Sequence, residues 1–200
     1  MRLFVICALL ATTCYGASST CASVRDIKLE LRAEVRGKFV PGAEVSAKLW
    51  SPQATQTVAK FAAKHRFYLS VENGERCYGV LNMGDDRSLP NELVMSGDVV
   101  LSKLESGTAQ DLIVIKSQEF HHSITEYQHL FTVTSATEKA AIRFLWMGLS
   151  YESSPAGEEV RYPLKLKSPG AFEYYSGGTN TAPKRFVFDP KAPRFSEQTL

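Results

Sequence analysis

The sequence has no excess of charge of either sign. It carries 23 Lys and Arg against 21 Asp and Glu, which gives a formal net charge of +2 for 200 residues. Like charges are scattered along the chain, without a block of five or six of one sign. Proteins that hold nucleic acid through its phosphates need a strongly basic surface. The composition therefore argues against nucleic acid as a partner.

The common catalytic and nucleotide-binding motifs are also missing. The sequence contains no Gly-x-Ser-x-Gly elbow, no His-Glu-x-x-His, no phosphate loop and no dinucleotide glycine fingerprint. Residues 148–152 match half of the elbow but lack the second glycine, and Asp85-Asp86 lacks the alternate spacing of a calcium loop. We therefore predict a protein that is not an enzyme.

Long hydrophobic runs are confined to the N-terminus. Residues 3–11 are apolar, which is about half of the roughly 20 residues that a membrane-spanning helix needs. Arg2 precedes this run and a short, more polar stretch ending at Gly16 follows it, in the order of a secretory signal peptide. We predict that residues 1–16 are removed and that the protein is secreted or periplasmic and not membrane-spanning. Cleavage after Ala22 is the alternative.

Cysteine is scarce. Of the 4 cysteines, Cys7 and Cys14 lie within the predicted signal peptide, which leaves Cys21 and Cys77. In an oxidising compartment two remaining cysteines predict a disulfide bond, which would close a loop of some 55 residues, on the order of 4 kcal/mol of stabilisation. Alternatively, Cys21 lies in a frayed N-terminus and does not meet Cys77.

Alternation of apolar and polar residues is the main signal for the fold. It is unbroken over residues 27–35, resumes over residues 45–49 after Pro41-Gly42, and indicates two half-buried antiparallel strands. Further strand-like runs, separated by turn-rich segments, occupy residues 66–71, 78–81, 98–104, 111–117, 125–134, 141–147, 160–167 and 185–188. This spacing predicts one all-β, mainly antiparallel β-sandwich over residues 17–188. The polar, proline-broken residues 189–200 predict a loose tail or, at most, an ordered arm.

At most one or two short helices are expected. Ser51-Pro52 is a good helix start for residues 53–64. Ser135 with Glu138 resembles a capping box and predicts a single helical turn before the next strand.

The first two strands and their turn carry a resemblance. The segment Phe39-Val40-Pro41-Gly42-Ala43-Glu44-Val45 joins an alternating strand to one that ends at Leu49-Trp50. This pattern, with the Gly-acid turn in residues 95–100, resembles the opening of immunoglobulin-like and arrestin-like sandwiches. The resemblance implies an immunoglobulin-like β-sandwich that binds or braces other molecules, and it transfers no catalytic residue.

Three of the 4 histidines lie close together. His121, His122 and His129, with Glu119 and Glu126, offer ligands for zinc or copper if a hairpin brings them together. In an extended backbone His121 and His122 point to opposite faces, so at most one joins His129. The spacing fits no known metal motif, and exposed histidines at a strand end are the alternative. We therefore predict no cofactor.

Seven aromatic residues lie between positions 162 and 195, interleaved with Lys165, Lys167, Lys184 and Arg185. In a strand the adjacent Tyr174 and Tyr175 must point to opposite faces, so one is expected to be exposed and the other buried. An exposed tyrosine beside Lys184 and Arg185 is a candidate contact for an anionic or glycan-like partner. The alternative is burial of these rings across a final hairpin.

Together these features predict a secreted or periplasmic, non-catalytic binding or accessory protein whose partner is a protein or a glycan. An extracytoplasmic metal-binding protein that uses the histidine cluster and a protease-inhibitor-like, loop-presenting domain are the alternatives. The sequence does not decide the oligomeric state.

Overall fold

The computed structural model describes residues 29–52, 67–74, 76–83, 99–120, 123–136, 139–189, 192 and 194–198. All regular structure in these residues is strand, and no helix occurs among them. The strands are β1 (Leu29–Val40), β2 (Ala43–Pro52), β3 (Tyr68–Asn73), β4 (Arg76–Asn82), β5 (Val99–Leu104), β6 (Leu112–Phe120), β7 (Ile124–Ala136), β8 (Lys139–Ser153), β9 (Glu159–Arg161), β10 (Leu164–Ser168), β11 (Ala171–Tyr174), β12 (Lys184–Asp189) and β13 (Arg194–Gln198).

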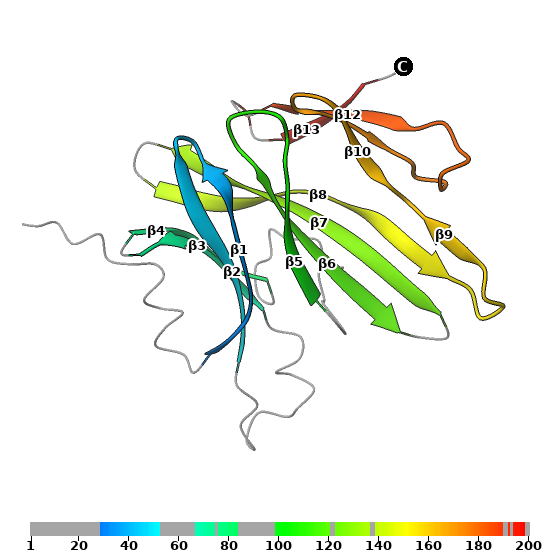
Figure 1. Ribbon diagram of the computed structural model, residues 1–200, viewed down its shortest axis with the longest axis horizontal. Coiled ribbons are helices and arrows are strands. Elements are labelled where there is room, and N and C mark those ends of the chain that lie inside the picture. The colour runs from blue at the N-terminus through cyan, green and yellow to red at the C-terminus, as the bar shows by residue number, and fades with distance from the viewer. Residues whose placement is uncertain are drawn as a thin grey trace, which may run out of the picture.

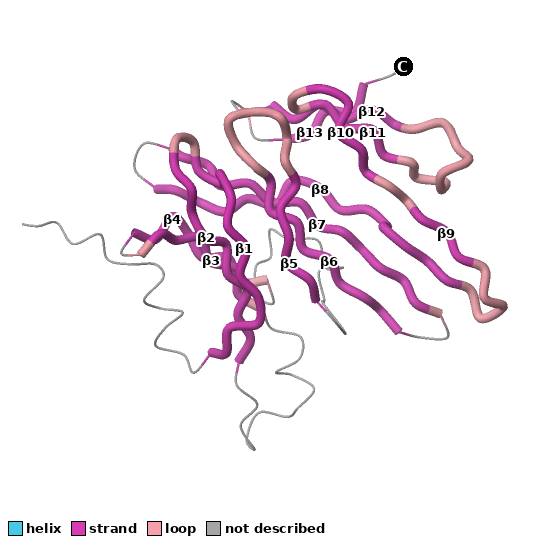
Figure 2. The backbone as a smooth tube through the Cα atoms, in the orientation of Figure 1, coloured by secondary structure: helices cyan, strands magenta, loops and turns pink. Residues whose placement is uncertain are grey.

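The strands form three antiparallel sheets in which each strand pairs with the next one along the chain. Sheet A contains β1 to β4, sheet B contains β5 to β9, and sheet C contains β10 to β13 (Figures 1 and 2). The prediction of an all-β, mainly antiparallel protein is confirmed, and the packing of the sheets is consistent with a β-sandwich. Because three sheets are present rather than the two of an immunoglobulin-like sandwich, the immunoglobulin-like type is not confirmed.

Sheet B lies between two hydrophobic clusters. On β6, Ile113 and Ile115 pack with residues of sheet A, whereas the alternate residues Leu112 and Val114 pack with residues of sheet C. Successive side chains of a strand point to opposite faces, so a strand covered on both sides is apolar at nearly every position. This explains the continuous apolar run Leu112-Ile113-Val114-Ile115, and Figure 1 shows sheet B extending from sheet A towards sheet C.

A β-bulge in β8 adjusts which residues face each cluster. Phe131 pairs with Phe144 and Leu130 pairs with Trp146, which leaves Leu145 as an extra residue. Phe144 packs on the sheet A side, and both Leu145 and Trp146 pack on the sheet C side. An extra residue in one strand shifts the alternation by one position, which is how the bulge supplies two apolar side chains to the same cluster.

Two local predictions differ from the structure. The helical turn expected at residues 135–138 is wrong for Ser135 and Ala136, which belong to β7 and pair with Ala140 and Lys139 of β8. Hairpin pairing satisfies the backbone groups that a helical turn would otherwise have used. The expected tail contains β13, because Phe195 packs against Phe172 and Phe188 with ring centroids 5.6 and 5.8 Å apart.

Other predictions lie outside the described residues. These are the signal peptide over residues 1–16 and the body of the helix over residues 53–64. The start predicted for that helix is wrong, because Ser51 and Pro52 belong to β2 and pair with Glu30 and Leu29 of β1. The described residues contain no helix long and apolar enough to cross a membrane.

Candidate functional site

Alternation along sheet C separates a buried side from an exposed side. Phe172, Tyr174 and Phe188 point towards sheet B and are buried. The opposite side, here called the outer face of sheet C, carries polar residues in register. Its charged residues are Lys165, Lys167, Glu173, Arg185, Asp189 and Arg194, of which Lys167 is placed there by its ion pair with Glu173.

Tyr174 belongs to the buried side. Its side chain is 7% exposed, and its ring meets the edge of Trp146 with centroids 4.7 Å apart. The hydroxyl donates a hydrogen bond to the carbonyl oxygen of Leu149 at 3.1 Å. Burial raises the pKa of Tyr174, so the hydroxyl stays a neutral donor. Tyr174 is therefore a packing residue that ties β11 to β8.

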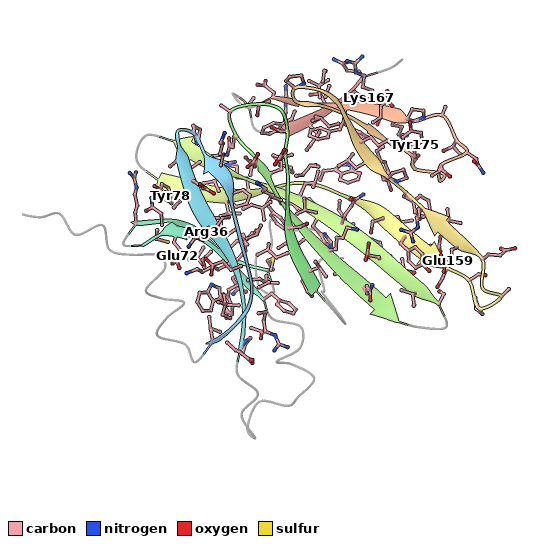
Figure 3. The ribbon with its side chains drawn as sticks, in the orientation of Figure 1. Arg36, Glu72, Tyr78, Glu159, Lys167 and Tyr175 are labelled. Carbon is pink, nitrogen blue, oxygen red and sulfur yellow. The ribbon has the colours of Figure 1, made fainter. Side chains whose placement is uncertain are left out.

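Tyr175 follows β11 and lies on the outer face, partly exposed (Figure 3). Its hydroxyl donates a hydrogen bond to Glu173 Oε2 at 3.3 Å, and Lys165 Nζ lies 5.0 Å from the ring centroid. Glu173 also pairs with Lys167, whose Nζ is 3.1 Å from Oε2. The ring therefore contacts a lysine, its hydroxyl is held by a carboxylate, and the side chain remains partly exposed.

The two basic residues predicted to accompany the exposed tyrosine lie on different sides. Arg185 pairs with Glu173 in the register and belongs to the outer face. Lys184 pairs with Tyr174, points to the other side and forms an ion pair with Glu197 at 3.3 Å. The grouping of Lys184 with Tyr175 is therefore wrong, because consecutive residues of one strand point to opposite faces.

The proposed metal ligands are not assembled in the described part of the chain. His129 is 1% exposed, and its Nε2 lies 3.0 Å from Ser117 Oγ. Desolvation by burial lowers the pKa of His129 to about 4, so the ring is neutral at pH 7. Glu126 points to the opposite face of β7, and the described residues hold no group of three His, Cys, Asp or Glu suited to a metal ion. His121, His122 and the Glu119 side chain lie outside the described residues.

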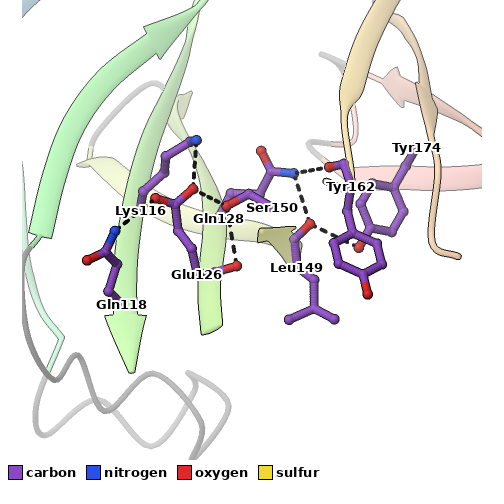
Figure 4. Close-up of polar contacts among 8 residues, drawn as sticks. All are labelled: Lys116, Gln118, Glu126, Gln128, Leu149, Ser150, Tyr162 and Tyr174. Atoms are coloured by element: carbon purple, nitrogen blue, oxygen red, sulfur yellow. Dashed lines mark hydrogen bonds and ion pairs between the residues drawn. The ribbon is translucent and has the colours of Figure 1, made fainter. Parts of the chain in front are cut away.

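Glu126 instead anchors a polar network on sheet B (Figure 4). Its carboxylate accepts hydrogen bonds from Lys116 Nζ at 2.9 Å, from Gln118 Nε2 at 3.4 Å and from the Ser150 hydroxyl. Desolvation alone would raise its pKa, but the hydrogen bonds from Ser150 and Lys116 outweigh it and lower the pKa. The carboxylate is therefore ionised at neutral pH.

Gln128, on the same face of β7 as Glu126, contacts the segment that leads from β9 to β10. Its Nε2 donates to the carbonyl oxygens of Leu149 and Tyr162, both at 3.4 Å (Figure 4). Tyr162 directly follows β9, and the backbone N–H of Tyr162 donates to the carbonyl oxygen of Ser150 at 3.0 Å. These hydrogen bonds fix the connection from β9 to β10 against sheet B. Beside this connection, sheet B carries the polar side chains of Glu126 and Gln128.

Cys77 lies on β4 opposite Glu72 and is partly buried. Its predicted partner Cys21 lies outside the described residues. The Cys21–Cys77 bond therefore stays a prediction.

Comparisons with known proteins give no family for this chain. No protein-family model matches it, and searches of curated proteins and of solved structures find no significant match. Its class is defined by the fold alone, as an all-β protein of antiparallel sheets.

Proposed function

We propose that this chain is a secreted or periplasmic, non-catalytic binding protein that holds an anionic glycan on the outer face of sheet C. The observation that carries the proposal is Tyr175, a partly exposed ring with Lys165 Nζ 5.0 Å from its centroid. Proposed export rests on the order of charged, apolar and small residues in positions 1–16.

The charge of the outer face favours an anionic ligand. Four cations (Lys165, Lys167, Arg185 and Arg194) lie there with two carboxylates (Glu173 and Asp189), which gives this one face a net charge of 4 − 2 = +2. The whole chain also has a net charge of +2, so the residues outside this face sum to 2 − 2 = 0. Local positive potential attracts anions and weakens as salt screens it.

The aromatic ring favours a glycan among anionic ligands. A tyrosine ring gives a flat apolar surface against which a sugar ring can pack, and its rim provides a hydroxyl. Arginine and lysine beside it form charge-assisted hydrogen bonds with carboxylate or sulfate groups. The combination of ring and cations on one face therefore suits a sugar polymer that carries such groups.

The neighbouring residues Lys184 and Arg185 provide a matched test. Binding of heparin and polygalacturonate fragments to the purified protein is measured by calorimetry at low and high salt. Lys165→Ala and Arg185→Ala are expected to weaken binding about tenfold, and Lys184→Ala to leave it unchanged, because only the first two lie on the outer face. Failure of both fragments to bind, or equal losses for Lys184→Ala and Arg185→Ala, would overturn the proposal.

A further inference from the structure

A second polar surface lies on sheet B and is separate from the outer face of sheet C. Gln118 of β6 pairs with Glu126 of β7, Glu126 pairs with Tyr151 of β8, and Tyr151 pairs with Arg161 of β9. Direct cross-strand partners share one face of a sheet. These four residues, here called the sheet B row, therefore form one line that runs about 14 Å across four strands.

A β-bulge shapes the middle of the row. The register shifts between the Glu126–Tyr151 and Tyr127–Leu149 pairs, so Ser150 is an extra residue in β8. The Ser150 hydroxyl contacts Glu126, which shows that Ser150 and Tyr151 both lie on the Glu126 side. Bulges are common next to functional sites because they redirect side chains in this way.

The polar groups of the row are held in position before any ligand arrives. The Glu126 carboxylate is fixed by Lys116, Gln118 and Ser150. The Arg161 guanidinium carbon lies 5.7 Å from the Tyr151 ring centroid and braces one side of that ring. Arg161 is exposed and the Lys116 side chain is 37% exposed, so ligand groups can reach the row. Pre-ordered side chains lower the entropy cost of binding.

The charges around the row cancel. Lys116 and Arg161 contribute two positive charges, and Glu126 with Glu159, two residues before Arg161 on the same face, contributes two negative ones, which gives 2 − 2 = 0. Glu126 and Glu159 would repel a multivalent anion. Lys116 and Arg161 would repel a cation. A neutral ligand with many hydroxyl groups meets neither conflict, since hydroxyls donate to carboxylates and accept from cations and amides.

We propose that the sheet B row is a binding site for a neutral oligosaccharide. One sugar ring packs against the Tyr151 ring on the side away from Arg161, and its hydroxyls bond to Glu126, Gln118 and Arg161. This site differs from the cationic outer face of sheet C in place and in charge. The two proposals are therefore tested independently of each other.

The test uses defined neutral sugars and residue-resolved detection. The ¹⁵N-labelled protein is titrated with cellohexaose, maltohexaose and chitohexaose, each to about 10 mM, a range that detects millimolar dissociation constants. At least one of them is expected to shift the amide signals of Gln118, Glu126, Tyr151 and Arg161. Arg161→Ala is expected to weaken that binding about tenfold. Arg36→Ala, which removes an exposed arginine from β1 of sheet A, is the matched control and should bind as the wild type does.

Two further variants distinguish a loss of binding from a loss of folding. Tyr151→Phe keeps the ring and should retain most of the affinity, whereas Tyr151→Ala should lose it while the dispersion of the remaining amide signals stays unchanged. Absence of shifts with all three sugars overturns the proposal. Shifts confined to other parts of the protein, or affinities unchanged by both Tyr151→Ala and Arg161→Ala, overturn it equally.

Discussion

Tyr174 and Tyr175 are neighbours on the chain, but one is buried against Trp146 and the other lies partly exposed beside Lys165. The same contrast occurs in β7, where His129 is 1% exposed on one face and Glu126 belongs to a polar network on the other. In both places one side of a strand carries residues that stabilise the fold. The other side carries polar side chains, and Tyr175 beside it is partly exposed. We propose that stability and binding depend on opposite faces of the sheets.

Tyr174→Ala should have the largest effect on the buried side. It removes the ring packed against Trp146 and the hydrogen bond to Leu149, so the free energy of unfolding should fall by about 3 kcal/mol. Denaturant unfolding measures this loss. A change below about 1 kcal/mol, typical of surface substitutions, would contradict the assignment of Tyr174 to the core.

His129 and Glu126 should affect the pH dependence of the unfolding free energy over different pH ranges. The pKa of His129 is about 4 in the folded protein, against the ordinary histidine value of 6.5 in the unfolded chain, so the unfolded chain binds more protons between these values. Stability is therefore fully present above pH 6.5 and falls as the pH decreases to 4, by about 3 kcal/mol at most. The pKa of Glu126 is lowered from 4.5, so its contribution is lost only at lower pH.

His129→Gln is the control for that measurement, because glutamine does not titrate. The wild type should lose stability between pH 6.5 and 4 relative to this variant. Parallel pH profiles for the two proteins would show that His129 is not a buried neutral group.

A smaller effect is expected for Tyr174→Phe. This variant keeps the ring but removes the hydroxyl that donates to the Leu149 carbonyl oxygen, so unfolding free energy should fall by about 1 kcal/mol. The comparison with Tyr174→Ala separates the hydrogen bond from the packing. Equal losses for the two variants would mean that the ring itself contributes little.

Several features follow directly from the sequence. Alternation over residues 27–35 and 45–49 predicts two strands, and the structure contains residues 29–35 within β1 and residues 45–49 within β2. The same rule predicts that Tyr174 and Tyr175 point to opposite faces, although it does not say which one is buried. That choice depends on contact with Trp146, which lies far away in the sequence.

Other features require knowledge of the register. Lys184 looks equivalent to Arg185 in the sequence, and only the pairing of β11 with β12 shows that it lies on the Tyr174 side. The sheet B row joins positions from 118 to 161, and its alignment depends on a bulge at Ser150 that no local pattern indicates. In β13 a single aromatic residue, Phe195, supplies the apolar contacts, which is too weak a signal for a strand.

The central claim is that the buried side of sheet C stabilises the fold and its outer face binds the ligand. The most direct test measures stability and heparin binding in parallel for Tyr174→Ala and Tyr175→Ala. Tyr175→Ala is expected to weaken heparin binding about tenfold while changing the unfolding free energy by less than about 0.5 kcal/mol. Tyr174→Ala is expected to lower the melting temperature by about 10 °C and to bind heparin normally below that temperature. If both variants only lower the melting temperature, or if neither changes stability or binding, the division between the two faces is contradicted.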